Sequence, residues 1–157
     1  MRRRGWWYGG LVGLLIFVGA VGGCTGSGDQ GGGGCLTFGD VEPNDTPLTA
    51  EFLDELFVGE CGTIYGSLFD PADVDRYSVL VRQSLTLVIT FDPSPLVDFD
   101  VQLFDADTGQ LIRDCGLNVV PEVCVVFFDV RGGDIAVDVV VTSFIGAGTY
   151  TLTIDAQ

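Results

Sequence analysis

Apolar and polar residues alternate along most of the chain after residue 60. In the segment SLTLVITF, Leu85, Leu87, Ile89 and Phe91 fall on one face, and the residues between them fall on the other. A period of two is typical of a strand with one buried face. Similar strands are predicted at 62–68, 76–81, 99–105, 122–130, 135–142 and 149–155. Seven to eight short strands separated by Gly, Asp and Pro predict an all-β sandwich.

One short helix is predicted before these strands. Asp45 or Thr46 can cap its N-terminus, and Pro47 suits the first helical position. The residues LTAEFLDEL, at 48–56, would continue it.

The first 24 residues are typical of an export signal. Three arginines at 2–4 precede an apolar stretch from Leu11 to Val21, and small residues precede Cys24. The apolar stretch is short for a membrane span, which takes about 20 residues. VGGC resembles a bacterial lipobox, so residues 1–23 are predicted to be a lipoprotein signal peptide and Cys24 the lipidated residue. The alternatives are an uncleaved anchor, or cleavage nearby that leaves Cys24 as a thiol.

The cysteine count agrees with lipidation. The chain has five cysteines, and removing Cys24 leaves Cys35, Cys61, Cys115 and Cys124. Four cysteines allow three pairings, of which sequence proximity favours Cys35–Cys61 and Cys115–Cys124. Buried or free thiols are the alternative in a less oxidising compartment.

Composition divides the rest of the chain in two. Residues 24–34 hold Cys24 and the glycine-rich stretch TGSGDQGGGG, which is predicted to be a flexible linker with a reach of roughly 18 Å. Residues 35–157 are predicted to form the folded domain.

The charge is strongly negative. The chain has 22 acidic residues, seven Lys or Arg residues and no histidine. Three of the seven basic residues lie in the export signal. Nucleic acids and anionic membrane surfaces are therefore poor partners, because phosphate neutralisation needs Lys and Arg.

Oxygen-bearing side chains crowd the start of the predicted domain. Asp40, Glu42 and Asn44 alternate, so in an extended chain they point the same way, and Asp45 follows in the turn. The segment FDPADVD can bring Asp73 and Asp75 to the same place, with Asp70 in reserve. Calcium prefers six to eight oxygen ligands. These residues are candidate calcium ligands; the alternative is an Asx turn with solvated acids.

Catalysis is not expected. A triad or a general base most often needs histidine, which the chain lacks, and the serines have no base to activate them. Paired carboxylates can hydrolyse glycosides, but these acids lie on predicted turns.

The chain resembles the bacterial pre-peptidase C-terminal domain family. The resemblance is carried by EPNDT at 42–46, GSL and DVDRYSVLV within 66–81, LTLVITF, DFDVQLFD at 98–105, and GTYTLTI at 148–154. It implies a jelly-roll-like antiparallel β-sandwich, export, and a non-catalytic role in binding, targeting or maturation. In similar domains from collagenases, the segments matching EPND and DVD bind calcium.

We therefore expect a lipid-anchored binding module of the bacterial cell envelope that holds an extracellular protein or polysaccharide. Outward Tyr, Phe and Thr side chains of one sheet would form the contact. The alternative is an accessory or structural envelope protein that assists a separately encoded secreted peptidase.

Overall fold

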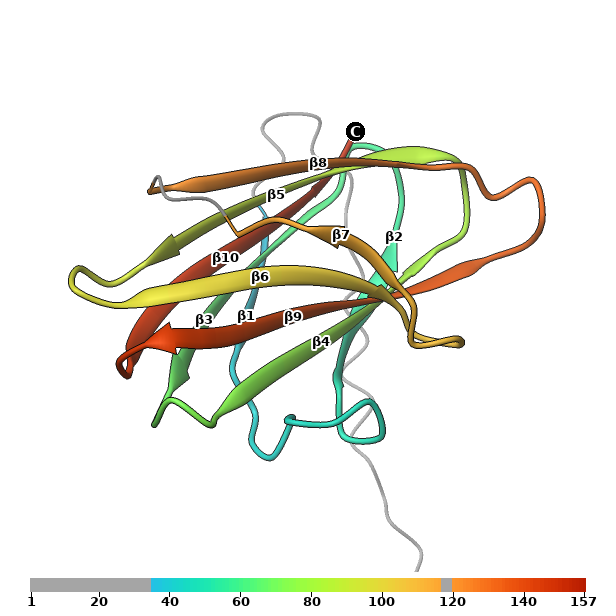
Figure 1. The fold of residues 1–157 in the computed structure, drawn as a ribbon. Helices are drawn as coiled ribbons and strands as arrows, with labels where there is room; N and C mark the ends of the chain where they lie inside the picture. Colours follow the sequence, from blue (N-terminus) through green and yellow to red (C-terminus); the bar gives the residue numbers. More distant parts are fainter. Residues whose placement is uncertain (1–34, 117–119) are drawn as a thin grey trace, which may run out of the picture. The chain divides into compact units, whose positions relative to one another are not determined.

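The computed structural model describes residues 35–116 and 120–157, which form a sandwich of two five-stranded sheets (Figure 1). The first sheet has the order β1-β3-β10-β5-β8, and the second has the order β2-β4-β9-β6-β7. In chain order the strands are β1 (Leu36–Gly39), β2 (Glu51–Leu56), β3 (Cys61–Leu68), β4 (Val74–Val81), β5 (Leu85–Pro93), β6 (Asp98–Asp105), β7 (Leu111–Asp114), β8 (Glu122–Phe128), β9 (Ile135–Ile145) and β10 (Gly148–Ala156).

The predicted all-β sandwich is confirmed, and so are its inward faces. Leu87, Ile89, Phe99, Val139 and Leu152 are each at most 1% exposed and lie between the two sheets. Side chains at alternate positions meet across this layer, so the period of two in the sequence becomes one continuous core.

The predicted helix at 45–56 is wrong. Thr46 and Thr49 form a single turn, in which the Thr49 N–H donates to the Thr46 carbonyl oxygen at 3.0 Å. The chain then becomes strand β2, which pairs in parallel with β4 and buries Leu53 and Leu56. The pairing with β4 satisfies the backbone of this segment and overrides its local helical preference.

Three short strands increase the predicted number to ten: β1, β2 and β7. β1 pairs with β3 in parallel, as β2 does with β4, so each sheet has one parallel pair at its edge. The other pairs are antiparallel.

Most connections between consecutive strands pass from one sheet to the other, and two of them form the site described below. The β1–β2 crossing, residues 40–50, runs from the edge of the first sheet to the edge of the second. The β3–β4 crossing, residues 69–73, connects the strands that pair with β1 and β2. Because β1 runs parallel to β3, both crossings leave the first sheet at the same end of the sandwich.

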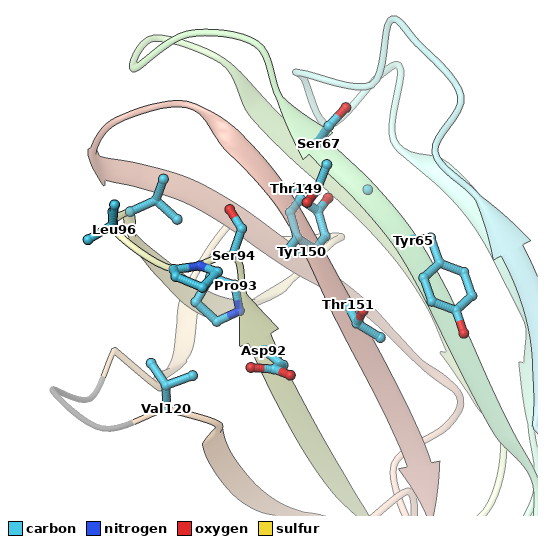
Figure 2. A pocket seen from close by; sticks show the side chains of 13 residues that line it. Tyr65, Ser67, Asp92, Pro93, Ser94, Leu96, Val120, Thr149, Tyr150 and Thr151 are labelled. Carbon is cyan, nitrogen blue, oxygen red and sulfur yellow. The ribbon is translucent and has the colours of Figure 1, made fainter.

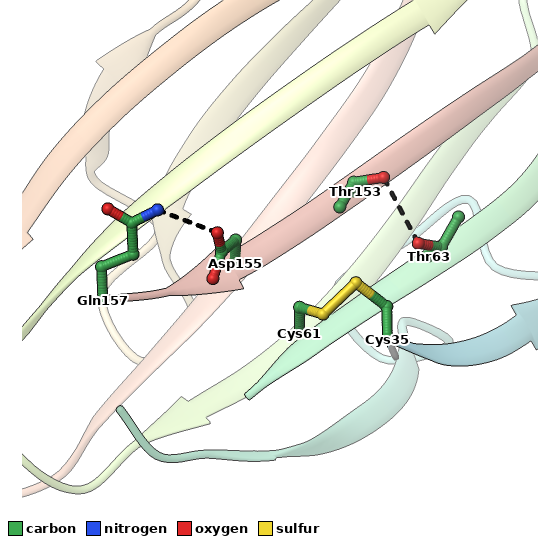
Figure 3. Close-up of a disulfide and its surroundings, with 6 residues drawn as sticks. All are labelled: Cys35, Cys61, Thr63, Thr153, Asp155 and Gln157. Atoms are coloured by element: carbon green, nitrogen blue, oxygen red, sulfur yellow. Dashed lines mark hydrogen bonds between the residues drawn. A yellow bond between two sulfur atoms is a disulfide. The ribbon is translucent and has the colours of Figure 1, made fainter. Parts of the chain in front are cut away.

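Two disulfides fasten the ends of the fold. Cys35–Cys61 joins the residue before β1 to the first residue of β3, in the neighbourhood of the C-terminus (Figure 3). Cys115–Cys124 joins the residue after β7 to β8, and so links the edges of the two sheets. These are the pairs that sequence proximity favours, and two disulfides agree with export from the cytoplasm.

Residues 1–34, which include Cys24 and the whole linker 24–34, lie outside the described residues, so the predicted signal peptide, lipidation and linker stay predictions. Among the residues described, no helix is long and apolar enough to cross a membrane.

Candidate metal centre

Asn44 fixes the shape of the β1–β2 crossing. Its side chain is fully buried, and its Nδ2 donates to Asp40 Oδ1 at 2.9 Å. Its backbone N–H donates to Glu42 Oε2 at 3.1 Å. Asn44 thus holds Asp40 and Glu42 on the same side of the crossing.

Asp40 connects the crossing to both sheets. Its Oδ2 accepts a hydrogen bond from the Ser67 backbone N–H at 3.2 Å, on β3. Its Oδ1 also accepts from the Tyr77 hydroxyl at 2.9 Å, on β4. One carboxylate therefore ties together the crossing, the first sheet and the second sheet.

The β1–β2 crossing meets β3 and β4 at Asp40, and we call this place the junction. Asp75 approaches Asp40 there from β4. It lies on β4, is fully buried, and its Oδ2 is hydrogen-bonded to the Tyr150 hydroxyl. Oxygens of Asp40, Glu42 and Asp75 lie within 4.8 Å of one another. These three acids could hold one metal ion.

Burial raises the pKa of Asp75 to about 8, against the opposing hydrogen bond from Tyr150. The neighbouring Asp40, Asp73 and Glu42 raise that pKa further, because like charges resist ionisation. Burial also raises the pKa of Glu42, opposed by the Asn44 N–H and assisted by Asp40, Asp73 and Asp45.

A chain of hydroxyls joins the carboxylates of Asp40 and Asp75. The Tyr77 and Tyr150 hydroxyl oxygens are 2.6 Å apart, and they lie between Asp40 on one side and Asp75 on the other. This chain contains three oxygen–oxygen contacts, whereas two hydroxyls supply only two protons. A proton on Asp75 completes it, which agrees with the raised pKa of that carboxyl.

Two oxygens at this junction are buried and have no hydrogen-bond partner within the described part of the chain. They are Asn44 Oδ1 and Asp75 Oδ1. An unpaired buried oxygen is costly, so such atoms usually mark a position at which a water molecule or an ion binds.

The remaining predicted ligands lie outside this group. Asp45 and Asp73 line an open depression of about 410 Å³ together with Glu42 and Asp70. Asp73 makes a local hydrogen bond within the β3–β4 crossing: its Oδ2 accepts from the Phe69 N–H at 2.6 Å. Asp70 likewise accepts from the Ala72 N–H at 2.7 Å. The structure thus brings Asp40, Glu42, Asn44 and Asp75 together, and leaves Asp45 and Asp73 beside them.

Sequence reasoning missed the two tyrosines of this junction and Glu51. Glu51 Oε2 accepts from the Val41 N–H at 3.1 Å and fastens the crossing to β2. A signal for the tyrosines exists: Tyr77 and Tyr150 occupy inward strand positions, and a buried tyrosine hydroxyl needs a polar partner.

No protein-family model matches the chain, and no curated protein matches its sequence. Solved structures do match. The pre-peptidase C-terminal domain of a collagenase from Bacillus anthracis aligns with a TM-score of 0.55 and 17% identity, over 73% of this chain and 99% of that domain. A periplasmic inhibitor of g-type lysozyme from Aeromonas hydrophila aligns with a TM-score of 0.52 and 12% identity, over 69% and 97%. The resemblance seen in the sequence is confirmed at the level of the fold.

Proposed function

We propose that the chain is an exported, non-catalytic binding module, anchored through lipid at Cys24 and stabilised by a calcium ion at the β1–β2 crossing. Its ligand is an extracellular protein or polysaccharide. The observation that carries the calcium site is the convergence of Asp40, Glu42 and Asp75 beside two buried oxygens without partners.

The chemistry of the donors favours calcium. Three carboxylates and the amide oxygen of Asn44 make an all-oxygen set, which suits a hard cation. Zinc prefers Cys and His ligands, and the chain has no histidine while the four described cysteines are in disulfides. Calcium accepts irregular geometry, whereas magnesium demands a near-ideal octahedron. An irregular loop facing one buried strand residue fits calcium better.

A bound cation would act as a brace. It would replace the repulsion among the three carboxylates by attraction, and join the β1–β2 crossing to β4. The predicted linker joins the other end of β1, so the brace would hold the end of β1 that lies away from the linker.

The proposal of a binding role rests on fold and composition. The fold is similar to that of a pre-peptidase C-terminal domain of a collagenase and to that of a periplasmic lysozyme inhibitor, and the chain offers no histidine for acid–base chemistry. The second candidate is an accessory envelope protein for a separately encoded peptidase, which the likeness to a collagenase domain favours. Deleting the gene and measuring secreted protease activity separates the two: loss of activity supports the accessory role.

Calcium is expected to raise the melting temperature. Saturation at about 100 times the dissociation constant adds about 2.7 kcal/mol to the free energy of unfolding, which corresponds to a shift of roughly 10 °C for a domain of this size. The measurement is a thermal melt at pH 7.5 in calcium and in chelator.

Two variants sharpen this measurement. Asp75→Asn should abolish the calcium shift while leaving the chelated protein at least as stable as wild type, because an amide is neutral in both states and folding no longer has to protonate or bury an ionised carboxylate. Asp107→Asn, on an exposed turn, is the matched control and should keep the full shift. Equal melting temperatures of the wild type in calcium and in chelator would contradict the proposed calcium site.

The stability of the metal-free protein is expected to fall as the pH rises from 5 to 8. The pKa of Asp75 is about 8 in the folded protein and near 3.8 when unfolded, so between these values the folded state binds the extra proton. The stabilisation is complete below pH 4 and lost by pH 8. Calcium binds the ionised carboxyl, so the calcium-induced shift should grow over the same range. A calcium-induced shift in melting temperature that becomes smaller between pH 5 and 8 would contradict the assignment of Asp75 as a calcium ligand.

A further inference from the structure

The outer face of the first sheet carries a regular array of hydroxyl groups. The register between β3, β10 and β5 places residues of three strands side by side in rows. One row is Thr63, Thr153 and Thr90, and the next is Tyr65, Thr151 and Asp92. The Thr63 and Thr153 hydroxyl oxygens are 3.3 Å apart (Figure 3).

A third row extends the array toward the β5–β6 loop. It consists of Ser67, Thr149 and Ser94; Ser67 is in register with Thr149, and the Ser94 N–H donates to the Thr149 carbonyl oxygen at 2.8 Å. Eight of the nine side chains carry a hydroxyl, and the ninth is a carboxylate. Rows lie about 6.8 Å apart along the strands, and neighbours within a row lie about 4.8 Å apart. We call this array the hydroxyl face.

The hydroxyl face is hollowed rather than flat. An open groove of about 940 Å³ runs over its second and third rows and is bordered by the β5–β6 loop (Figure 2). Tyr65 lies at one side of the groove and Asp92 and Ser94 at the other, with Thr151 and Thr149 on its floor (Figure 2).

Two apolar groups flank these hydroxyls. The Tyr65 side chain is 60% exposed on β3. Leu96, in the β5–β6 loop, is 99% exposed and has a φ of 74°, a backbone conformation that a leucine rarely adopts. An exposed apolar residue held in strained backbone is more often found at binding sites than elsewhere.

We propose that this groove binds a neutral polysaccharide chain, an inference that rests on the proposed binding role and names its ligand. Sugar rings present hydroxyls at their edges and C–H groups on their faces. Regularly spaced Thr and Ser hydroxyls, with Asp92, match the edges, because each hydroxyl both donates and accepts. The Tyr65 ring and the Leu96 side chain match the faces.

Charge selects against other polymers. None of the described residues that line the groove is basic, and Asp92 adds a negative charge. Of the described arginines, Arg76, Arg82 and Arg131 form ion pairs with acidic residues elsewhere. An anionic polymer would meet no counter-charge here, whereas an uncharged glycan has no such penalty.

The test is retention of the full-length chain, purified in detergent, on insoluble chitin and cellulose and on an array of neutral glucans. We expect retention on at least one of these polymers, in calcium. Tyr65→Ala and Thr151→Val should each weaken it about tenfold, because they remove a stacking surface and a hydroxyl without altering the core.

Matched controls lie on the second sheet. Phe52 is 59% exposed, close to the value for Tyr65, and Thr142 lies on β9. Phe52→Ala and Thr142→Val should retain wild-type binding. Absence of retention on every polymer, equal binding by Tyr65→Ala and wild type, or retention on a protein fibre alone would each overturn the proposal. If calcium does not shift the melting temperature, the proposed calcium site is wrong, but retention on polysaccharide is still tested by this experiment. The failure of the calcium site and the failure of the polysaccharide proposal are therefore distinguishable.

Discussion

Replacing Gly66 by alanine is expected to lower the free energy of unfolding by about 3 kcal/mol or more, because the added methyl group has no room. A Cβ on Gly66 would lie 2.3 Å from both Cζ and the hydroxyl oxygen of Tyr150. Gly66 is on β3, paired with Tyr150 on β10, so neither backbone can move without breaking the first sheet. The ring would have to turn away from Asp75 and Tyr77, and its hydrogen bonds to both would be lost.

The substitution should also weaken the calcium response. Tyr150 holds Asp75 in position, so displacing its ring moves one of the three carboxylates. Urea unfolding gives the stability, and melts in calcium and chelator give the response. Gly132→Ala is the control, because a Cβ there meets no atom within 4 Å.

A double-mutant cycle tests the cause. If the clash with the ring is responsible, Gly66→Ala should cost little in a Tyr150→Leu background, since the ring atoms that it meets are gone. Equal costs in the two backgrounds would show that Gly66 acts by some other route.

Replacing Arg76 by methionine is expected to cost about 3–5 kcal/mol, because it leaves a buried carboxylate without its partner. Arg76 Nη1 donates to Asp138 Oδ2 at 3.1 Å, and their side chains are only 15% and 3% exposed. The guanidinium also lies over the ring of Phe104, 5.6 Å from its centre. Methionine keeps much of the packing volume and removes the charge.

The chain contains a matched surface pair. Arg82 and Glu55 are 2.6 Å apart, with side chains 45% and 37% exposed. Arg82→Met should cost less than about 1 kcal/mol, since solvent screens an exposed pair. The double variant Arg76→Met/Asp138→Val should recover most of the stability, because no charge is then left buried. Equal losses for Arg76→Met and Arg82→Met in chemical denaturation would contradict this view of the buried pair.

How far the sequence predicts the metal site depends on the residue. Asp40, Glu42 and Asn44 are close in sequence and alternate, so a local pattern could single them out. Asp75 is a candidate only because the segment FDPADVD can approach them, and nothing local predicts its complete burial. Tyr77 and Tyr150 are 73 residues apart, and only strand pairing brings their hydroxyls into contact.

The hydroxyl face shows the same division. Each strand's alternation places Thr or Ser outward, and this is visible in the sequence. The rows depend on which strands are neighbours and in what register, and β3, β10 and β5 are far from consecutive. Likewise, the sequence around Leu53 and Leu56 is compatible with a helix or a strand, and pairing with β4 makes this segment strand β2.

Local patterns in the sequence predict seven of the ten strands, their inward faces and the acidic start of the domain, because a period of two and a run of nearby ligands are local properties of the chain. Three features are visible only in the folded protein: two crossings meet beside Asp75, two tyrosines join the carboxylates, and hydroxyls form rows. Those features depend on sheet order and register, which arise from hydrogen bonds and core packing between residues distant in the chain.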